Sequence, residues 1–152
     1  MGKKERFKYR RNERNYKNNP FFNRWLREFV PQLTSEQYNE IIHEQYVWHA
    51  FSYEIIPADK YLCGDAARRA YNEANKEGAK CYMLWFDDNP TAITSEFDTA
   101  EKLESDNGEY SEFYAVGKNY AWTYVLTHET SCGLGPYFMV NPKRQEIKQK
   151  NL

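Results

Sequence analysis

One stretch of the sequence, residues 113–138, constrains the fold more than any other. Two runs rich in aromatic and β-branched residues, 113–116 and 120–127, lie on either side of a short segment that begins with Gly117. This arrangement is typical of a β-hairpin. The second run ends in three polar residues, 127–129, and a loop with two glycines follows. We therefore expect a strand that delivers polar side chains to a loop, which is a common way to build a functional site.

Apolar runs elsewhere predict further strands, and apolar residues at helical spacing predict helices. Residues 80–86 form a nearly continuous apolar run bounded by turn residues, which indicates a buried strand. Residues 46–56 are too aromatic and β-branched for a clean helix, so we interpret their second part as a strand. The predicted strands cover residues 50–56, 80–86, 112–117, 120–127 and 137–140, with a short optional strand at 91–97. The predicted helices cover residues 21–30, 35–47 and 65–77.

These segments predict a single α+β domain. A chain of 152 residues is long enough for one sizeable core. Aromatic residues make up 17% of the chain, and they bury enough area to build that core although the chain is rich in charge. We expect two layers, with three main helices packed on a mostly antiparallel sheet of four to five strands.

The charge is distributed unevenly along the chain and divides it into three parts. Residues 1–19 carry a net charge of +6 and residues 141–152 carry +3, whereas residues 20–140 carry −10. We interpret the ends as a basic flexible arm and a basic tail on either side of the domain. An acidic domain favours a basic partner protein and disfavours a nucleic acid lying on it. The arm is either a solvated tail or a segment that contacts RNA through its Lys and Arg residues.

Several classes of protein are not indicated by this sequence. No apolar run approaches the roughly 20 residues that span a bilayer. The charged N-terminal segment has no apolar run behind it, as a secretory signal would have. The 3 cysteines are widely spaced and form no Cys-x-x-Cys pair, so neither a disulfide framework nor a zinc knuckle is predicted. We therefore expect a cytoplasmic protein that does not contact a membrane.

The predicted helix at residues 65–77 begins with charged residues. Asp65 is a suitable N-cap, because its carboxylate can accept the free N–H groups of the first turn. Arg68 falls in that first turn, where the helix dipole disfavours a cation. Either Arg68 is a simple surface residue, or an anion lies beside it, supplied by Asp59, Asp65, Glu129 or a ligand.

Four short stretches together are similar to a known pattern. They are Trp48-His49-x-Phe51-Ser52-Tyr53, Gly64-Asp65-x-Ala67-Arg68-x-Ala70, Trp122-x-Tyr124-x-x-Thr127-His128-Glu129 and Gly135-Pro136-Tyr137-Phe138. The combination resembles a family of short bacterial proteins that is defined only as a domain of unknown function, over residues 33–138. The resemblance implies a bacterial or phage origin and carries no activity with it. It draws attention to His49, Asp65, Arg68, His128 and Glu129.

Two catalytic interpretations of these residues are open. A metal site could use His49, His128, Glu129 and Cys132, but the spacing of His128 and Cys132 lacks a second close pair of ligands, so we expect neither a metal nor a cofactor.

A metal-independent hydrolase or nuclease would instead use His128 as general base and Arg68 to hold a phosphate. His49, Tyr124 and Glu129 would assist in the same site. The same side chains could also form only a buried hydrogen-bond network that holds the loop to the helix.

The interpretation we favour is a protein-binding module. It rests on the acidic domain, on the 13 tyrosines and 4 tryptophans, and on the lack of a catalytic motif. Such a module could act as an immunity or counter-defence protein that neutralises a basic partner. The residues expected to bind are Trp48, His49, Tyr53, Asp65, Arg68, Trp122, Tyr124, His128, Glu129 and Tyr137.

Overall fold

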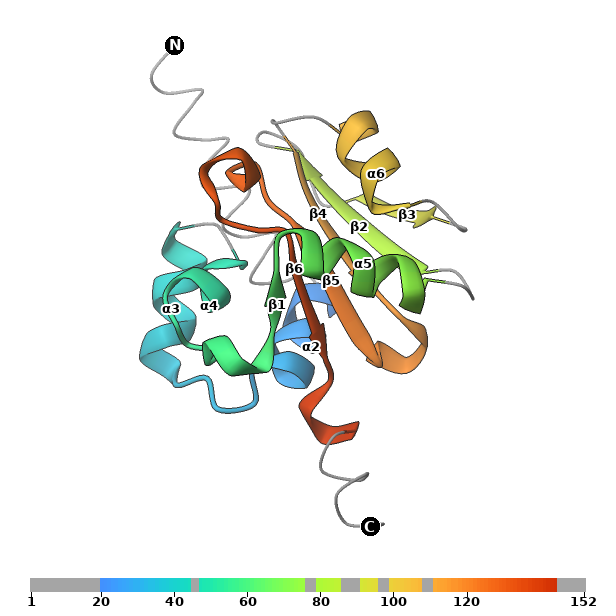
Figure 1. The fold of residues 1–152 in the computed structure, drawn as a ribbon. Helices are drawn as coiled ribbons and strands as arrows, with labels where there is room; N and C mark the ends of the chain where they lie inside the picture. Colours follow the sequence, from blue (N-terminus) through green and yellow to red (C-terminus); the bar gives the residue numbers. More distant parts are fainter. Residues whose placement is uncertain are drawn as a thin grey trace.

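The structure, a computed structural model, is shown in Figure 1. It describes residues 20–44, 47–75, 79–85, 91–95, 99–107 and 111–144. The predicted basic arm, residues 1–19, and most of the predicted tail lie outside the described residues. Among the described helices, none has the length and apolar character needed to cross a membrane.

Six strands form one antiparallel sheet in the order β1-β6-β5-β4-β2-β3. Their bounds are Leu62–Cys63 for β1, Ala79–Trp85 for β2, Thr91–Ser95 for β3, Ser111–Val116 for β4, Trp122–Leu126 for β5 and Tyr137–Val140 for β6. The hairpin expected around Gly117 is confirmed as β4 and β5. The optional strand at 91–97 is present as β3, whereas β1 has no counterpart in the prediction.

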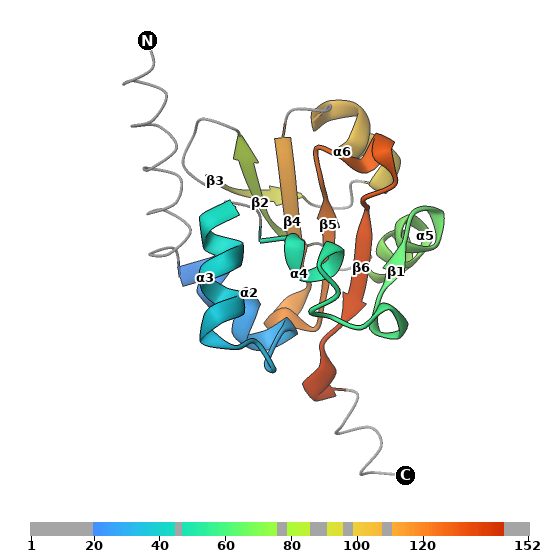
Figure 2. The ribbon, with the colours of Figure 1, turned by 90° about the vertical axis from the view of Figure 1, so that its left-hand side faces the viewer.

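Helices cover both faces of this sheet (Figure 2). Their bounds are Pro20–Phe29 for α2, Ser35–Glu44 for α3, His49–Ser52 for α4, Asp65–Ala74 for α5 and Ala100–Asn107 for α6. Helices α2, α3 and α4 pack on one face, and α5 and α6 pack on the other. The predicted α+β class is confirmed, but the domain has three layers where two were expected, because both faces of the central strands are apolar.

The alternation of side chains along β5 explains why both faces need cover. Successive residues of a strand point to opposite sides of the sheet. Thr123 and Val125 face α2, whereas Tyr124 and Leu126 face α5 and α6, and all four side chains are buried. A sheet that is apolar on both faces requires a helical layer on each.

The core on the α2 side is built around Trp25, which is fully buried. Its indole Nε1 donates a hydrogen bond to Thr123 Oγ1 at 2.8 Å, and Thr123 in turn donates to the carbonyl of Ala115 at 2.9 Å. Aromatic rings surround this pair, with Phe51 at 5.9 Å and Tyr114 at 6.0 Å from the Trp25 ring centre. The buried indole N–H is therefore satisfied through a strand residue.

The strand predicted at residues 50–56 is wrong. Residues 49–52 form the short helix α4, and the chain turns at residues 53–56. Val47, Trp48 and Phe51 are all fully buried. Their spacing of three and four residues fits a helical face, and the aromatic composition obscured that period.

One detail of the predicted helices also needs correction. Asp65 is the first residue of α5 and does not cap it, because Gly64 precedes the helix with φ of 67°, a left-handed conformation that glycine adopts without strain. Helix α3 is described from Ser35 to Glu44, and residues 45–46 of the predicted helix lie outside the described residues. Its start is as expected, since Thr34 and Gln37 exchange the two hydrogen bonds of a capping box at 3.0 and 3.1 Å.

The buried bond between Trp25 and Thr123 generates a prediction about stability. Thr123→Val removes the hydroxyl acceptor with little change of shape and leaves the indole N–H unpaired. We expect the free energy of unfolding, measured by denaturant titration, to fall by about 1–3 kcal/mol. The control is the same substitution in a Trp25→Phe background, where no indole N–H remains to be left unpaired. An equal loss in both backgrounds would contradict this role of the bond.

Candidate functional site

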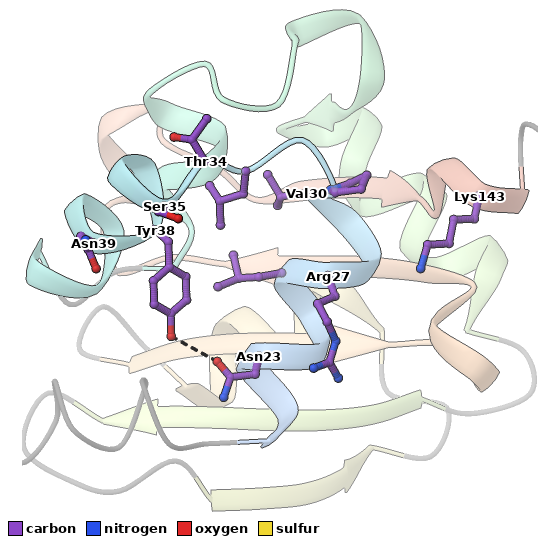
Figure 3. A pocket seen from close by; sticks show the side chains of 11 residues that line it. Asn23, Arg27, Val30, Thr34, Ser35, Tyr38, Asn39 and Lys143 are labelled. Atoms are coloured by element: carbon purple, nitrogen blue, oxygen red, sulfur yellow. Dashed lines mark hydrogen bonds between the residues drawn. The ribbon is translucent and has the colours of Figure 1, made fainter.

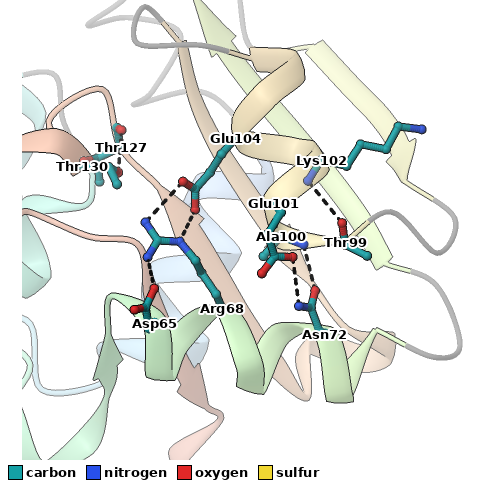
Figure 4. A network of polar contacts seen from close by, with 10 residues as sticks. All are labelled: Asp65, Arg68, Asn72, Thr99, Ala100, Glu101, Lys102, Glu104, Thr127 and Thr130. Atoms are coloured by element: carbon teal, nitrogen blue, oxygen red, sulfur yellow. Dashed lines mark hydrogen bonds and ion pairs between the residues drawn. The ribbon is translucent and has the colours of Figure 1, made fainter.

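A cavity of about 280 Å³ lies where α5, α6 and the loop after β5 meet. The described residues that line it are Arg68, Glu104, Leu126, Thr127, His128, Thr130 and Ser131. Arg68 and His128, which the sequence analysis expected in one site, therefore line the same cavity. The edge where β5 ends and the first turn of α5 supply one wall each, as Figure 4 shows for Arg68 and Thr127.

Arg68 is held by two carboxylates (Figure 4). Its Nε and Nη2 both donate to the carboxylate of Glu104, the second bond measuring 3.2 Å, and its Nη1 donates to Asp65 Oδ1 at 2.6 Å. The Arg68 and Glu104 side chains are 23% and 28% exposed, whereas that of Asp65 is 81% exposed. An anion does lie beside Arg68, supplied by Asp65 together with Glu104, which the sequence analysis did not consider.

A second set of hydrogen bonds ties α5 to α6. The Asn72 side chain accepts from the backbone N–H of Ala100 at 2.8 Å and donates to Glu101 Oε2 at 3.2 Å (Figure 4). Together with the bond from Arg68 to Glu104, these contacts join the two helices at two points one turn apart along α5. The wall of the cavity is therefore fixed by side chains that come from both helices.

This arrangement decides what Arg68 can do chemically. The hydrogen bond to Glu104 raises the pKa of Arg68 above its ordinary value, so the guanidinium stays charged. Three of its five N–H donors are bonded to Glu104 and Asp65, and the two carboxylates would repel a phosphate placed beside them. The exposed Arg69, which follows Arg68 in the chain, offsets the charge of Asp65, so the excess of negative charge on the two helices comes from α6.

The loop after β5 is held in shape by Thr127, which is buried. Its Oγ1 donates to the carbonyl of Leu134 and accepts from the backbone N–H of Glu129 at 3.1 Å. Thr130 Oγ1 donates back to the carbonyl of Thr127 at 2.9 Å. These bonds fix the backbone on both sides of His128. The strand thus delivers a rigid polar loop to the cavity, as the sequence analysis expected.

His128 is the mostly buried member of this loop, with a side chain 13% exposed. Its ring meets the Trp48 ring edge-on, at 5.8 Å between centres. Its Nε2 lies 4.0 Å from Glu129 Oε1. The imidazole is therefore packed between an indole and a carboxylate at the wall of the cavity.

Tyr124 lies beneath the ion pair and is fully buried. Its ring stacks on Tyr71 at 4.4 Å, and its hydroxyl finds no hydrogen-bond partner among the described residues. Burial raises the pKa of Tyr124, and the negative charge of Glu104 raises it further. The phenol therefore stays protonated at neutral pH and does not supply a base.

His49 does not line the described wall of the His128 cavity. Its Nδ1 lies 2.8 Å from Ser52 Oγ, and its ring stacks on Tyr53 at 4.2 Å between ring centres. The ring of Trp48 lies at 4.3 Å and is tilted by 38° to it. His49 and His128 thus contact the same indole without lining one cavity. The acid/base set predicted for a hydrolase is not assembled around a single described cavity.

The remaining predicted residues serve mainly packing. Tyr137 is 3% exposed and stacks on Phe51 at 4.5 Å in the core on the α2 side. Trp122 lies on the opposite face of the sheet, partly exposed, and stacks on Phe138 at 5.7 Å.

In the described part of the chain, no three His, Cys, Asp or Glu side chains come close enough to hold a metal ion, so His49, His128, Glu129 and Cys132 are not gathered into one cluster.

Glu104 is the residue of the site that the sequence analysis missed. Arg68 in the first turn of its helix does predict an anionic partner nearby. Glu104, however, lies 36 positions further along the chain. Only the packing of α5 against α6 brings the two together, and no spacing rule in the sequence reports that contact.

Comparison with models of protein families identifies the family of this chain. Residues 3–138 match the model of a family described as a domain of unknown function, DUF4275. The chain belongs to this family. The match includes every residue of the cavity wall and of the ion-pair network. Comparisons with curated proteins and with solved structures find no match.

The buried phenol of Tyr124 predicts how stability depends on pH. Because its pKa is higher in the folded chain than the ordinary value of 10.0, its contribution is complete below pH 10 and is lost as the pH rises further. Replacing Tyr124 with Phe should make the alkaline loss of unfolding free energy shallower, by up to about 1.4 kcal/mol per pH unit. Denaturant titrations between pH 8 and about 11 measure this slope, with Tyr53→Phe at an exposed ring as the control. Identical profiles for the two variants would contradict the assignment.

Proposed function

We propose that this protein binds a partner protein through the face formed by α5 and α6. The observation that carries the proposal is that Glu104 and Asp65 share Arg68 beside a cavity of about 280 Å³, on a face where α5 and α6 together carry five acidic and three basic residues. A recess of this size with acidic surroundings suits the side chain of a Lys or Arg from a basic partner.

The charges around the cavity support a basic partner. Helix α6 carries three acidic residues and one basic residue, and Glu101 is exposed. Glu73 on α5 and Asp65 at its start are exposed as well. Negative potential on one face speeds the encounter with a positively charged protein, and this effect weakens as salt is added.

Apolar side chains on the same face supply candidate anchors. Leu62 pairs with Phe138 across β1 and β6, and Trp122 pairs with Val140 across β5 and β6. Directly opposed residues of an antiparallel pair share a face of the sheet. Leu62 and Val140 are 45% and 39% exposed, and Trp122 is partly exposed. Buried apolar anchors inside a charged rim are the usual composition of a protein interface.

The geometry favours this function over the hydrolase considered for the same residues. Arg68 directs three of its five N–H donors at carboxylates, and those carboxylates oppose the approach of a phosphate. A role as an immunity or counter-defence protein is the biological form that fits a small acidic binder of a basic partner.

The test is affinity capture from cells of the source organism, followed by direct measurement of binding to the recovered protein. Replacing Asp65 with Asn and Glu101 with Gln removes two exposed charges from the proposed face. We expect the double variant to bind about fivefold more weakly at low salt, and the difference to shrink as salt is raised.

The matched control carries Glu36→Gln and Glu40→Gln on α3, which removes two exposed charges from the opposite side of the sheet. This variant should bind as the unaltered chain does. The proposal is wrong if no protein is recovered, if the recovered partner is acidic, or if the α3 variant weakens binding as much as the α5–α6 variant does.

A further inference from the structure

A second and larger cavity, of about 680 Å³, lies on the other side of the sheet between α2, α3 and the turn after β6 (Figure 3). Its described lining residues are Asn23, Leu26, Arg27, Val30, Pro31, Leu33, Thr34, Ser35, Tyr38, Asn39 and Lys143. None of these is among the residues that the sequence predicted to bind or to catalyse. The volume falls in the range of pockets that bind small molecules.

The floor of this cavity is apolar. Leu26 and Val30 come from consecutive turns of α2 and are 4% and 1% exposed, so they present only their outer atoms to it. Leu33, in the connection to α3, is partly buried against the same core. The ring of Tyr38 closes one side and is positioned by a hydrogen bond from its hydroxyl to Asn23 Oδ1 at 3.3 Å (Figure 3).

Two cations complete the lining. Arg27 is exposed, and none of the ion pairs between described residues involves it. Lys143 lies 3.7 Å from Glu28, whose carboxylate is also hydrogen-bonded by Asn141 at 2.9 Å. Among the described lining residues there is no Asp or Glu, and Glu28 offsets only one of the two cations, so a net positive charge remains beside the cavity.

The position of the cations relative to the floor defines a ligand class. Arg27 follows Leu26 on α2, so a charged head bound there leaves the rest of a ligand facing Leu26, Val30 and Leu33. In small-molecule pockets, a small number of polar groups beside a largely apolar surface fix the orientation of the ligand. A carboxylate or sulfonate can accept charge-assisted hydrogen bonds from guanidinium and ammonium groups.

We propose that this cavity binds a small organic acid, with its anionic head at Arg27 and Lys143 and its apolar body on the surface of Leu26, Val30 and Leu33. The ligand is opposite in charge to the partner proposed for the α5–α6 face, and the two sites lie on opposite sides of the sheet. The inference therefore stands independently of the proposed protein-binding function.

The experiment titrates the full chain with decanoate and follows its backbone amide signals by nuclear magnetic resonance, below the concentration at which micelles form. Residues 26–39 and 143 should shift together and give a single dissociation constant. The Arg27→Gln/Lys143→Gln variant should bind decanoate about tenfold more weakly. Leu33→Asn, which leaves both cations in place, should also weaken binding because it removes apolar contact.

The matched control is Arg24→Gln/Arg144→Gln, which removes one cation from the same helix and one from the position next to Lys143. Arg24 lies over the ring of Tyr120 at 4.1 Å and does not line the cavity, nor does Arg144. This variant should bind decanoate as the unaltered chain does, and decyltrimethylammonium should shift none of the cavity residues. Equal weakening by both double variants, equal binding of the cationic amphiphile, or shifts confined to residues outside the cavity would overturn the proposal.

Discussion

The hydrogen-bonded ion pair between Arg68 and Glu104 is the contact on which the site depends. It joins α5 to α6 above the buried ring of Tyr124, and both of its members line the cavity. Asp65 extends the pair toward solvent, since its side chain is 81% exposed. If Arg68 alone were removed, Glu104 would be left as a partly buried anion without its partner, an arrangement that costs more than the pair itself gains.

The loop that carries His128 forms the other wall of the cavity, and hydrogen bonds to the backbone hold it there. Its shape comes from the hydroxyl of Thr127, which is buried at the end of β5 and bonds to the backbone on both sides of the loop. One wall of the cavity is thus fixed by charge and the other by backbone hydrogen bonds. His128 packs against the ring of Trp48. His49 contacts the same indole but does not line the cavity.

Local features were readable from the sequence and long-range ones were not. The hairpin around Gly117 and the helices predicted at residues 21–30 and from residue 35 each depend on residues a few positions apart. The helix α4 was mistaken for a strand because its aromatic and β-branched residues suit either structure, and only burial of Trp48 and Phe51 decides between them. The third layer and the partner of Arg68 both depend on where α6 packs, which a single sequence does not report. The same limit applies to the cavity between α2 and α3, whose cations lie more than a hundred residues apart in the chain.

The most direct test of this account is a double-mutant cycle on the pair, using Arg68→Gln, Glu104→Gln and the double variant. The quantity to measure is the free energy of unfolding by denaturant titration at low and at high salt. The account predicts a coupling energy of about 1–2 kcal/mol, retained in large part at high salt because both side chains are less than a third exposed. A coupling near zero, or one that salt abolishes, would show that the pair does not hold α5 to α6, and the account of the site would then be wrong.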